Sequence, residues 1–151
     1  DADPEVLVAI GDLTTSLGAA TITSIEWNIS AFDKSDGGTL SATVRFNEAV
    51  DVVTTGGTPT ISVTNGNEGS GTGRGPHSLS YASGSGGNEL VFTLAIGAAN
   101  AATNADDVLS FETQDVALNS GTIKDAGTST NAELTITEAQ CSAAGTITVE
   151  A

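Results

Sequence analysis

The alternation of apolar and polar side chains over residues 38–52 constrains the fold more than any other feature of this sequence. The apolar positions of its first half are two residues apart, and they are Leu40, Ala42, Val44 and Phe46. Because successive side chains of a strand point to opposite faces, this period predicts a β-strand with one buried face. Asn47 and Glu48 interrupt the period before it resumes, which predicts either a β-bulge or a change of sheet there.

Other short segments share this character and are separated by turns rich in Gly, Asn and Asp. The expected strands are residues 5–10, 21–29, 60–63, 77–81, 89–96, 108–112, 116–118, 122–123, 132–137 and 145–149. The pair 77–81 and 89–96 is expected to form a hairpin. No helix of useful length is predicted, although the alanine-rich crossover at residues 97–107 has room for a helical turn. Short strands at this spacing predict an all-β sandwich.

The composition is consistent with one β-sandwich domain. The chain has 151 residues, 18 Gly, no Met and 4% aromatic residues, so its core must consist of aliphatic side chains around a few rings. Trp27 is the only Trp and is the expected core anchor. A single cysteine excludes an internal disulfide bond.

The charge limits the partners of this protein. Four Lys and Arg stand against 19 Asp and Glu, a formal charge of −15, which disfavours nucleic acid and anionic membranes as partners. Such a surface suits a salty medium that screens self-repulsion, and no apolar run is long enough to span a membrane. The chain begins at Asp1, as expected if it is processed, trimmed or cut from a longer one, and we expect an extracellular or virion-surface location.

The sequence shows no catalytic constellation, so we expect no enzyme activity and no catalytic or cofactor-binding residue. A nucleophilic triad needs a histidine, and the only one, His77, follows Pro76 at the start of a strand and is expected on the surface. Cys141 has no cation nearby in the sequence to lower its pKa, so a buried or half-buried thiol is expected. With one His and one Cys, the sequence has too few of the side chains that usually bind zinc.

Calcium is the one metal that the sequence leaves open, although we expect no cofactor. Acidic residues lie in several turns whose oxygens would meet at one end of a sandwich, namely Asp33, Asp36, Asp106, Asp107, Asp115 and Asp125. In an acidic protein, such turns are usually solvated instead.

Two further features invite comparison with known kinds of site. A covalent Lys–Asn isopeptide bond occurs in some adhesin folds, and Lys34 and Lys124 are the only lysines that could form one. The glycine-rich loop of residues 65–75, which carries Arg74, lacks the Gly-Lys-Ser ending of a phosphate-binding loop and is expected to be mobile.

Residues 22–137 resemble the bacterial immunoglobulin-like repeats of large secreted adhesins, cyanobacterial surface proteins and phage virion proteins. The segments that carry the resemblance are 44–52, 57–61, 79–86 with 90–93, 107–109 and 118–127. The resemblance implies a Greek-key sandwich that acts as a spacer, an adhesive or a decorative module. The loop at residues 65–75 and the strand-like pieces at 5–10 and 145–149 depart from the pattern.

These features predict an immunoglobulin-like Greek-key β-sandwich with extra strands at both ends. We expect an N-terminal strand or arm over residues 1–20, the sandwich over 21–138, and a C-terminal strand over 139–151 that packs on the same domain or on a neighbour. The favoured function is a structural phage capsid decoration or virion appendage subunit, whose partners are a capsid or appendage protein or copies of itself. The alternative is a secreted adhesin module that binds a host glycan or protein.

Overall fold

The computed structural model describes residues 18–66 and 75–151, and most of its regular structure is β-strand. Its elements are β1 (Ile22–Trp27), β2 (Phe32–Asp33), β3 (Gly38–Phe46), β4 (Val50–Val53), β5 (Thr60–Gly66), β6 (His77–Ser83), β7 (Glu89–Ile96), β8 (Val108–Phe111), β9 (Gln114–Asp115), β10 (Thr122–Asp125), β11 (Thr135–Ile136), α2 (Glu138–Ala144) and β12 (Ile147–Glu150). Within the described ranges, no helix is both long and apolar enough to cross a membrane. The predicted strand at residues 5–10 lies outside the described residues, as does most of the predicted loop after β5.

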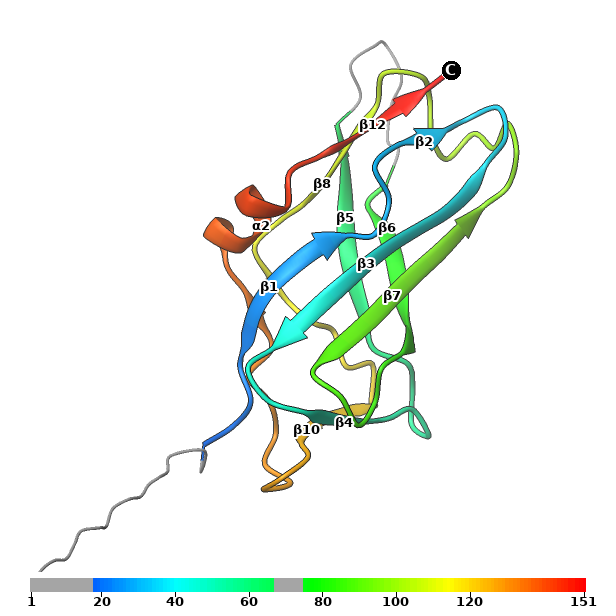
Figure 1. Cartoon of the computed structure of the whole chain (residues 1–151). Coiled ribbons are helices and arrows are strands. Elements are labelled where there is room, and N and C mark those ends of the chain that lie inside the picture. Colours follow the sequence, from blue (N-terminus) through cyan, green and yellow to red (C-terminus); the bar gives the residue numbers. More distant parts are fainter. Residues whose placement is uncertain (1–17, 67–74) are drawn as a thin grey trace, which may run out of the picture.

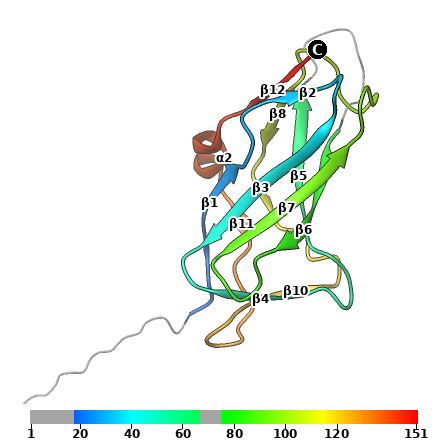
Figure 2. The same cartoon turned by 45° about the vertical axis from the view of Figure 1, so that its right-hand side comes forward.

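The protein is an all-β sandwich made largely from one curled sheet. Among the described residues, eight strands are hydrogen-bonded in the order β1-β3-β7-β6-β5-β8-β12-β2. The sheet turns back on itself at β6 and β5, so that β1, β3 and β7 face β5, β8 and β12 across the core (Figures 1 and 2). The chain enters at the end of the sandwich near β4 and β10, and Glu150 lies at the opposite end (Figure 1).

The strand order is that of an immunoglobulin-type Greek key. In chain order the main strands are β1, β3, β5, β6, β7, β8 and β12. β1, β3, β7 and β6 are neighbours in this order, and so are β5, β8 and β12. This is the arrangement of the two sheets of an immunoglobulin domain. Here β6 also pairs with β5, which joins the two layers along one side.

The alternating pattern of β3 produces the core as predicted. Leu40, Ala42 and Val44 are fully buried, and β3 pairs along its length with β1 on one side and β7 on the other. On β7, the predicted inward set of Leu90, Phe92, Leu94 and Ile96 is buried except for the half-buried Leu94. The expected hairpin of β6 and β7 is also confirmed.

The interruption after Phe46 is a change of sheet rather than a bulge. The backbone N–H and the side-chain Oδ1 of Asn47 bond to the backbone of Thr21, at 2.9 and 2.8 Å, and the strand ends there. The chain then forms β4, which pairs with β10 in a separate two-stranded sheet. The predicted change of sheet is therefore confirmed, and the alternative of a β-bulge after Phe46 is not.

The C-terminal segment differs most from the prediction. Residues 139–151 were expected to form only a strand, but α2 precedes β12. Thr137 caps this helix in a capping box, because its side chain accepts from the Gln140 N–H while the Gln140 side chain accepts from the Thr137 N–H. β12 pairs with β8 and β2 of its own chain, so it is the last strand of the sandwich and not an addition to it.

Smaller differences have local causes. Trp27 is half-buried rather than a central core residue, and its ring stacks on Phe111 with centroids 4.3 Å apart. Residues 97–107 contain turns but no helix. The predicted strand at 116–118 is reduced to one bridge between Ala117 and Thr60. Of the predicted strand at 132–137, only the short β11 forms, and it pairs with β9 in a separate two-stranded sheet.

The buried face of β7 generates a stability prediction. Replacing Phe92 by Ala removes a fully buried ring that packs edge-on against Tyr81, and should lower the free energy of unfolding by about 3–5 kcal/mol. Thr93→Ala, one residue along and on the opposite face, should change it by less than about 1 kcal/mol. Urea unfolding of both variants checks this, and equal losses would contradict the described register.

Candidate functional site

The structure places His77 in the interior, which corrects the prediction of a surface histidine. His77 is 7% exposed at the start of β6, and its Nε2 atom lies 3.2 Å from Nδ2 of Asn65 on β5. The same Asn65 amide donates to Oδ2 of the fully buried Asp107, at 3.0 Å. Since Asn65 Nδ2 is a donor, the His77 Nε2 atom accepts from it and is unprotonated.

This network links β5 and β6 to the crossover before β8. Asp107 Oδ2 also accepts from the backbone N–H of Asn104, so the carboxylate joins β5 to the crossover before β8. Burial lowers the pKa of His77 from its ordinary value, and the negative charge of Asp107 only partly opposes this. The neutral ring contacts an amide rather than a hydroxyl or thiol that it would activate.

Cys141 is a buried thiol, as predicted. Its side chain is directed into the interior from α2, and burial raises the pKa of the thiol, with the carboxylates of Glu138 and Glu112 adding to the effect. A thiol with a raised pKa is largely protonated at neutral pH and is a poor nucleophile. Neither sequence candidate therefore has the environment of a catalytic group.

The acidic turns do not combine into one metal site. Asp33 accepts from the Ser35 hydroxyl and from the N–H groups of Ser35 and Asp36, which lowers its pKa. Asp106 reaches the same end of the sandwich through its N–H bond to Val149.

The remaining acidic turns belong to other elements. Asp115 accepts from Thr135 on β11, and Asp125 closes its own turn on β10. Across residues 18–66 and 75–151, no three His, Cys, Asp or Glu side chains are placed to hold a metal ion together.

Of the two lysines that an isopeptide bond would need, Lys34 makes an ordinary hydrogen bond from Nζ to the backbone oxygen of Asn100, at 3.3 Å. Lys124 lies on β10, opposite Asp51 of β4. Arg74 lies outside the described residues.

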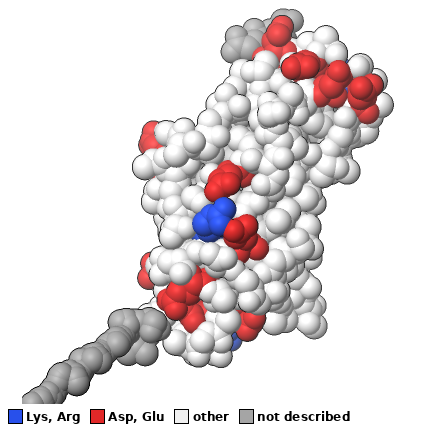
Figure 3. Space-filling view, in the orientation of Figure 1, with Lys and Arg blue, Asp and Glu red and all other residues white. Residues whose placement is uncertain are grey.

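Charged groups are sparse on the face formed by β1, β3 and β7. Arg45 on β3 pairs with Glu26 on β1, 3.3 Å away, and with Glu89 on β7. In Figure 3 this group appears as a blue patch between red ones, and further acidic groups gather towards the end where β2 lies. Most of this face is therefore neutral although the protein is strongly acidic.

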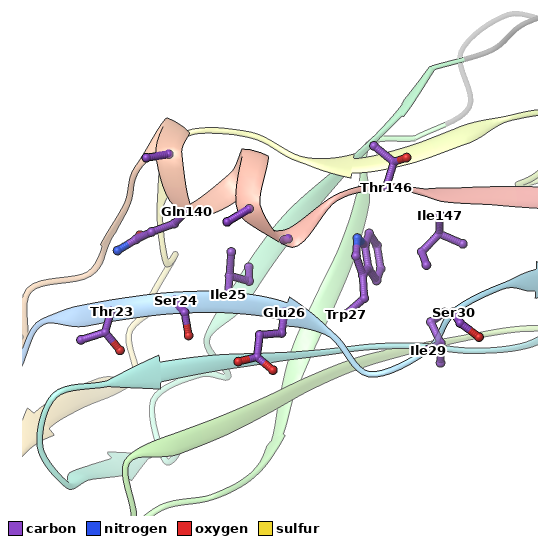
Figure 4. A pocket seen from close by; sticks show the side chains of 13 residues that line it. Thr23, Ser24, Ile25, Glu26, Trp27, Ile29, Ser30, Gln140, Thr146 and Ile147 are labelled. Atoms are coloured by element: carbon purple, nitrogen blue, oxygen red, sulfur yellow. The ribbon is translucent and has the colours of Figure 1, made fainter.

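A groove lies between β1 and α2, and we call it the β1–α2 groove. It has a volume of about 750 Å³, within the ~300–1,000 Å³ range of ligand sites. Its lining is mixed. The apolar side chains are those of Ile25, Trp27, Ile29, Ala139, Ala143, Ala144 and Ile147, and the polar ones are those of Thr23, Ser24, Glu26, Ser30, Gln140 and Thr146. Figure 4 shows the Ile25 side chain pointing towards α2 and the Trp27 ring rising towards the turn before β12.

One edge of β1 has no strand partner along this groove, and at the 2% exposed Ile25 it is covered. The Asn28 N–H donates to the Ser41 carbonyl of β3. Because the direction of the backbone groups alternates along a strand, those of Glu26 also point towards β3. The backbone N–H and C=O of Ile25 and Trp27 consequently point to the other edge. β1 is terminal in the sheet, and no described strand pairs with this edge.

Two side-chain hydrogen bonds tie α2 to β1 at the ends of the groove. Gln140 Nε2 donates to the Ile22 carbonyl at 3.0 Å, and Trp27 Nε1 donates to the Gly145 carbonyl at 3.2 Å. A second groove of about 550 Å³ lies on the other side of α2, beside β8, where Glu112, Glu138 and Cys141 line it. Sequence reasoning missed both grooves because it missed α2, and the Thr137-x-x-Gln140 spacing was the available signal.

Searches of protein-family models, of curated proteins and of solved structures returned no match for this chain. The immunoglobulin-type strand order describes the fold alone. The features that bear on function are the β1 edge and its groove.

The buried His77 predicts a pH-dependent stability. Because its pKa is lower in the folded than in the unfolded state, the folded protein binds fewer protons, and its stability should fall as the pH drops below about 6.5. His77→Gln should flatten this part of the stability profile, measured by urea unfolding between pH 7.5 and 5, relative to the neighbouring exposed variant Ser78→Ala. Parallel profiles for the two variants would show that His77 makes no such contribution.

Proposed function

We propose that this protein is a non-enzymatic structural module that acts through protein–protein contacts on a virion or extracellular surface. The unpaired β1 edge and the β1–α2 groove beside it are the observation that carries this proposal. An unpaired strand edge offers backbone donors and acceptors to another chain, and a bordering groove gives its side chains somewhere to bind.

The chemistry of the described interior supports a non-enzymatic role. The neutral ring of His77 is engaged by Asn65, and the thiol of Cys141 has a raised pKa in its buried position. The sandwich instead has a largely neutral face, an unpaired edge strand and a groove of mixed polarity beside it. These features favour binding over bond-making chemistry.

The favoured setting is a phage capsid decoration or virion appendage, with a capsid or appendage protein, or other copies of this chain, as partners. The resemblance of residues 22–137 to virion and surface modules supports this setting, as does a groove of a size that fits a short segment of chain. On a lattice, one modest contact is repeated many times, and multivalency turns weak single contacts into tight attachment. The net charge of −15 would keep unattached copies soluble.

Fractionation tests the proposed setting. Antibodies against the purified protein should detect it in the virus-particle band when a lysate of the producing culture is separated on a density gradient, and immunogold labelling should mark the particle surface. Washing at moderate salt should leave it attached, because many contacts share the load.

Two other outcomes would overturn the virion proposal. Recovery with the bacterial envelope, together with binding on a glycan array, would favour the adhesin alternative. Recovery only as free protein, bound to neither particles nor envelope, would reject a surface role altogether.

A further inference from the structure

A single amide nitrogen connects the buried polar groups at one end of the sandwich. Nδ2 of Asn65 lies 3.2 Å from Nε2 of His77, 3.0 Å from Oδ2 of Asp107 and 3.5 Å from the carbonyl oxygen of Ala102. The carboxylate and the carbonyl can only accept, so they fix the amide with its nitrogen towards them. His77 and Asp107 are 7% and 0% exposed, so both depend on this nitrogen rather than on solvent.

The same part of the chain attaches the crossover before β8 to β12. The Asp106 N–H donates to the Val149 carbonyl and the Val149 N–H donates to the Asp107 carbonyl, both at 2.8 Å. Two residues thus oppose Val149, and the first of them, Asp106, has a φ of 71°. This is the pattern of a β-bulge whose first residue is left-handed, a position that glycine usually occupies. An aspartate is strained there, so the bulge depends on the contacts that surround it.

The network has no arrangement that accepts a proton on Nε2 of His77. The protonated ring would direct an N–H at the N–H of Asn65, so two donors would face each other. Turning the Asn65 amide over would bring its oxygen to the ring, but that oxygen would then face Oδ2 of Asp107. Because one nitrogen makes all of these contacts, at least one of them has to break when His77 becomes charged.

The charged groups around His77 do not remove this conflict. β5 and β8 carry no charged residue, and β7 carries only Glu89, at the end remote from His77. In the crossover, Asp106 is exposed and Lys34 bonds to the backbone. Burial lowers the pKa of His77, and only the charge of Asp107 opposes this effect. A charged ring would therefore be drawn to Asp107 and would compete with Asn65 for it.

We propose that Asn65, His77 and Asp107 form an acid-sensitive latch that holds the crossover to β12. When His77 takes up a proton, the Asn65 bridge opens, Asp107 is no longer held in place, and the bulge at Asp106 separates from Val149. The ladders of β3 with β1 and β7 contain none of these residues and stay paired. The latch goes beyond the proposed function, because it is a conformational response at the end of the sandwich where β12 and β2 lie (Figure 1).

Native-state hydrogen exchange of the whole chain, followed by NMR, measures the latch. The protection factor of the Val149 amide should fall about tenfold or more between pH 7.5 and 5, because each opening frees His77 to bind a proton. Up to 1 M urea should leave this exchange unchanged, as in a local opening, whereas exchange of the Val44 amide on β3 should follow global unfolding and accelerate. His77→Gln should abolish the pH dependence at Val149, and the exposed control Ser78→Ala should keep it.

Three results of this experiment would overturn the latch. They are a Val149 protection factor that stays constant with pH, a urea dependence equal to that of Val44, and a pH dependence that survives in His77→Gln. Thermal melting at pH 7.5 shows whether each variant is folded.

A second pair of variants tests the latch from the β12 side and leaves the buried network intact. Asp106→Gly and Asp106→Ala both remove the same exposed carboxylate, but glycine relieves the left-handed strain and alanine increases it. A firmer latch excludes the proton more strongly, so the His77 ring should titrate about half a pH unit lower in Asp106→Gly than in Asp106→Ala. The Cε1–H resonance of His77, the only histidine, reports the midpoint. Equal midpoints would show that the bulge and His77 are not coupled, even if His77→Gln does not fold.

Discussion

The structure depends on how its main sheet closes. β6 is hydrogen-bonded to β7 on one side and to β5 on the other, so one flank of the sandwich is sealed by backbone pairing. On the opposite flank no described strand joins the two layers, and α2 covers it instead. A helix has its backbone groups satisfied internally and cannot pair with a strand, so the edge of β1 beside it has no strand partner. The unpaired edge is thus a consequence of the topology.

The way α2 is fixed explains how that edge is covered. Gln140 completes the capping box with Thr137 and also binds the Ile22 carbonyl, so the same side chain forms the helix and anchors it to β1. At the other end, Trp27 stacks on Phe111 and reaches the Gly145 carbonyl. Between these two anchors lies the β1–α2 groove. The residues that pack α2 onto β1 therefore also set the ends of the groove.

The sequence was sufficient for the strands of the core and insufficient for the site. Leu40 and Phe46 belong to the alternating pattern of β3, and Phe92 belongs to that of β7. Each pattern is local to its own segment, so both strands could be predicted without information from elsewhere in the chain. α2 buries only Cys141 over 7 residues, which is too short for a helical period to emerge. The burial of His77 depends on Asn65 and on Asp107, which is 42 positions from Asn65, and no local pattern reports such a pairing.

The entry and exit of the described chain at opposite ends of the sandwich have a mechanical consequence. A pull between the two ends acts roughly along the strands, and its first targets are β1 and β12. β1 is joined to β3 by a ladder of bonds perpendicular to that pull, so the load is shared by all of them in shear. A domain loaded in this direction resists extension better than one peeled open from a strand end.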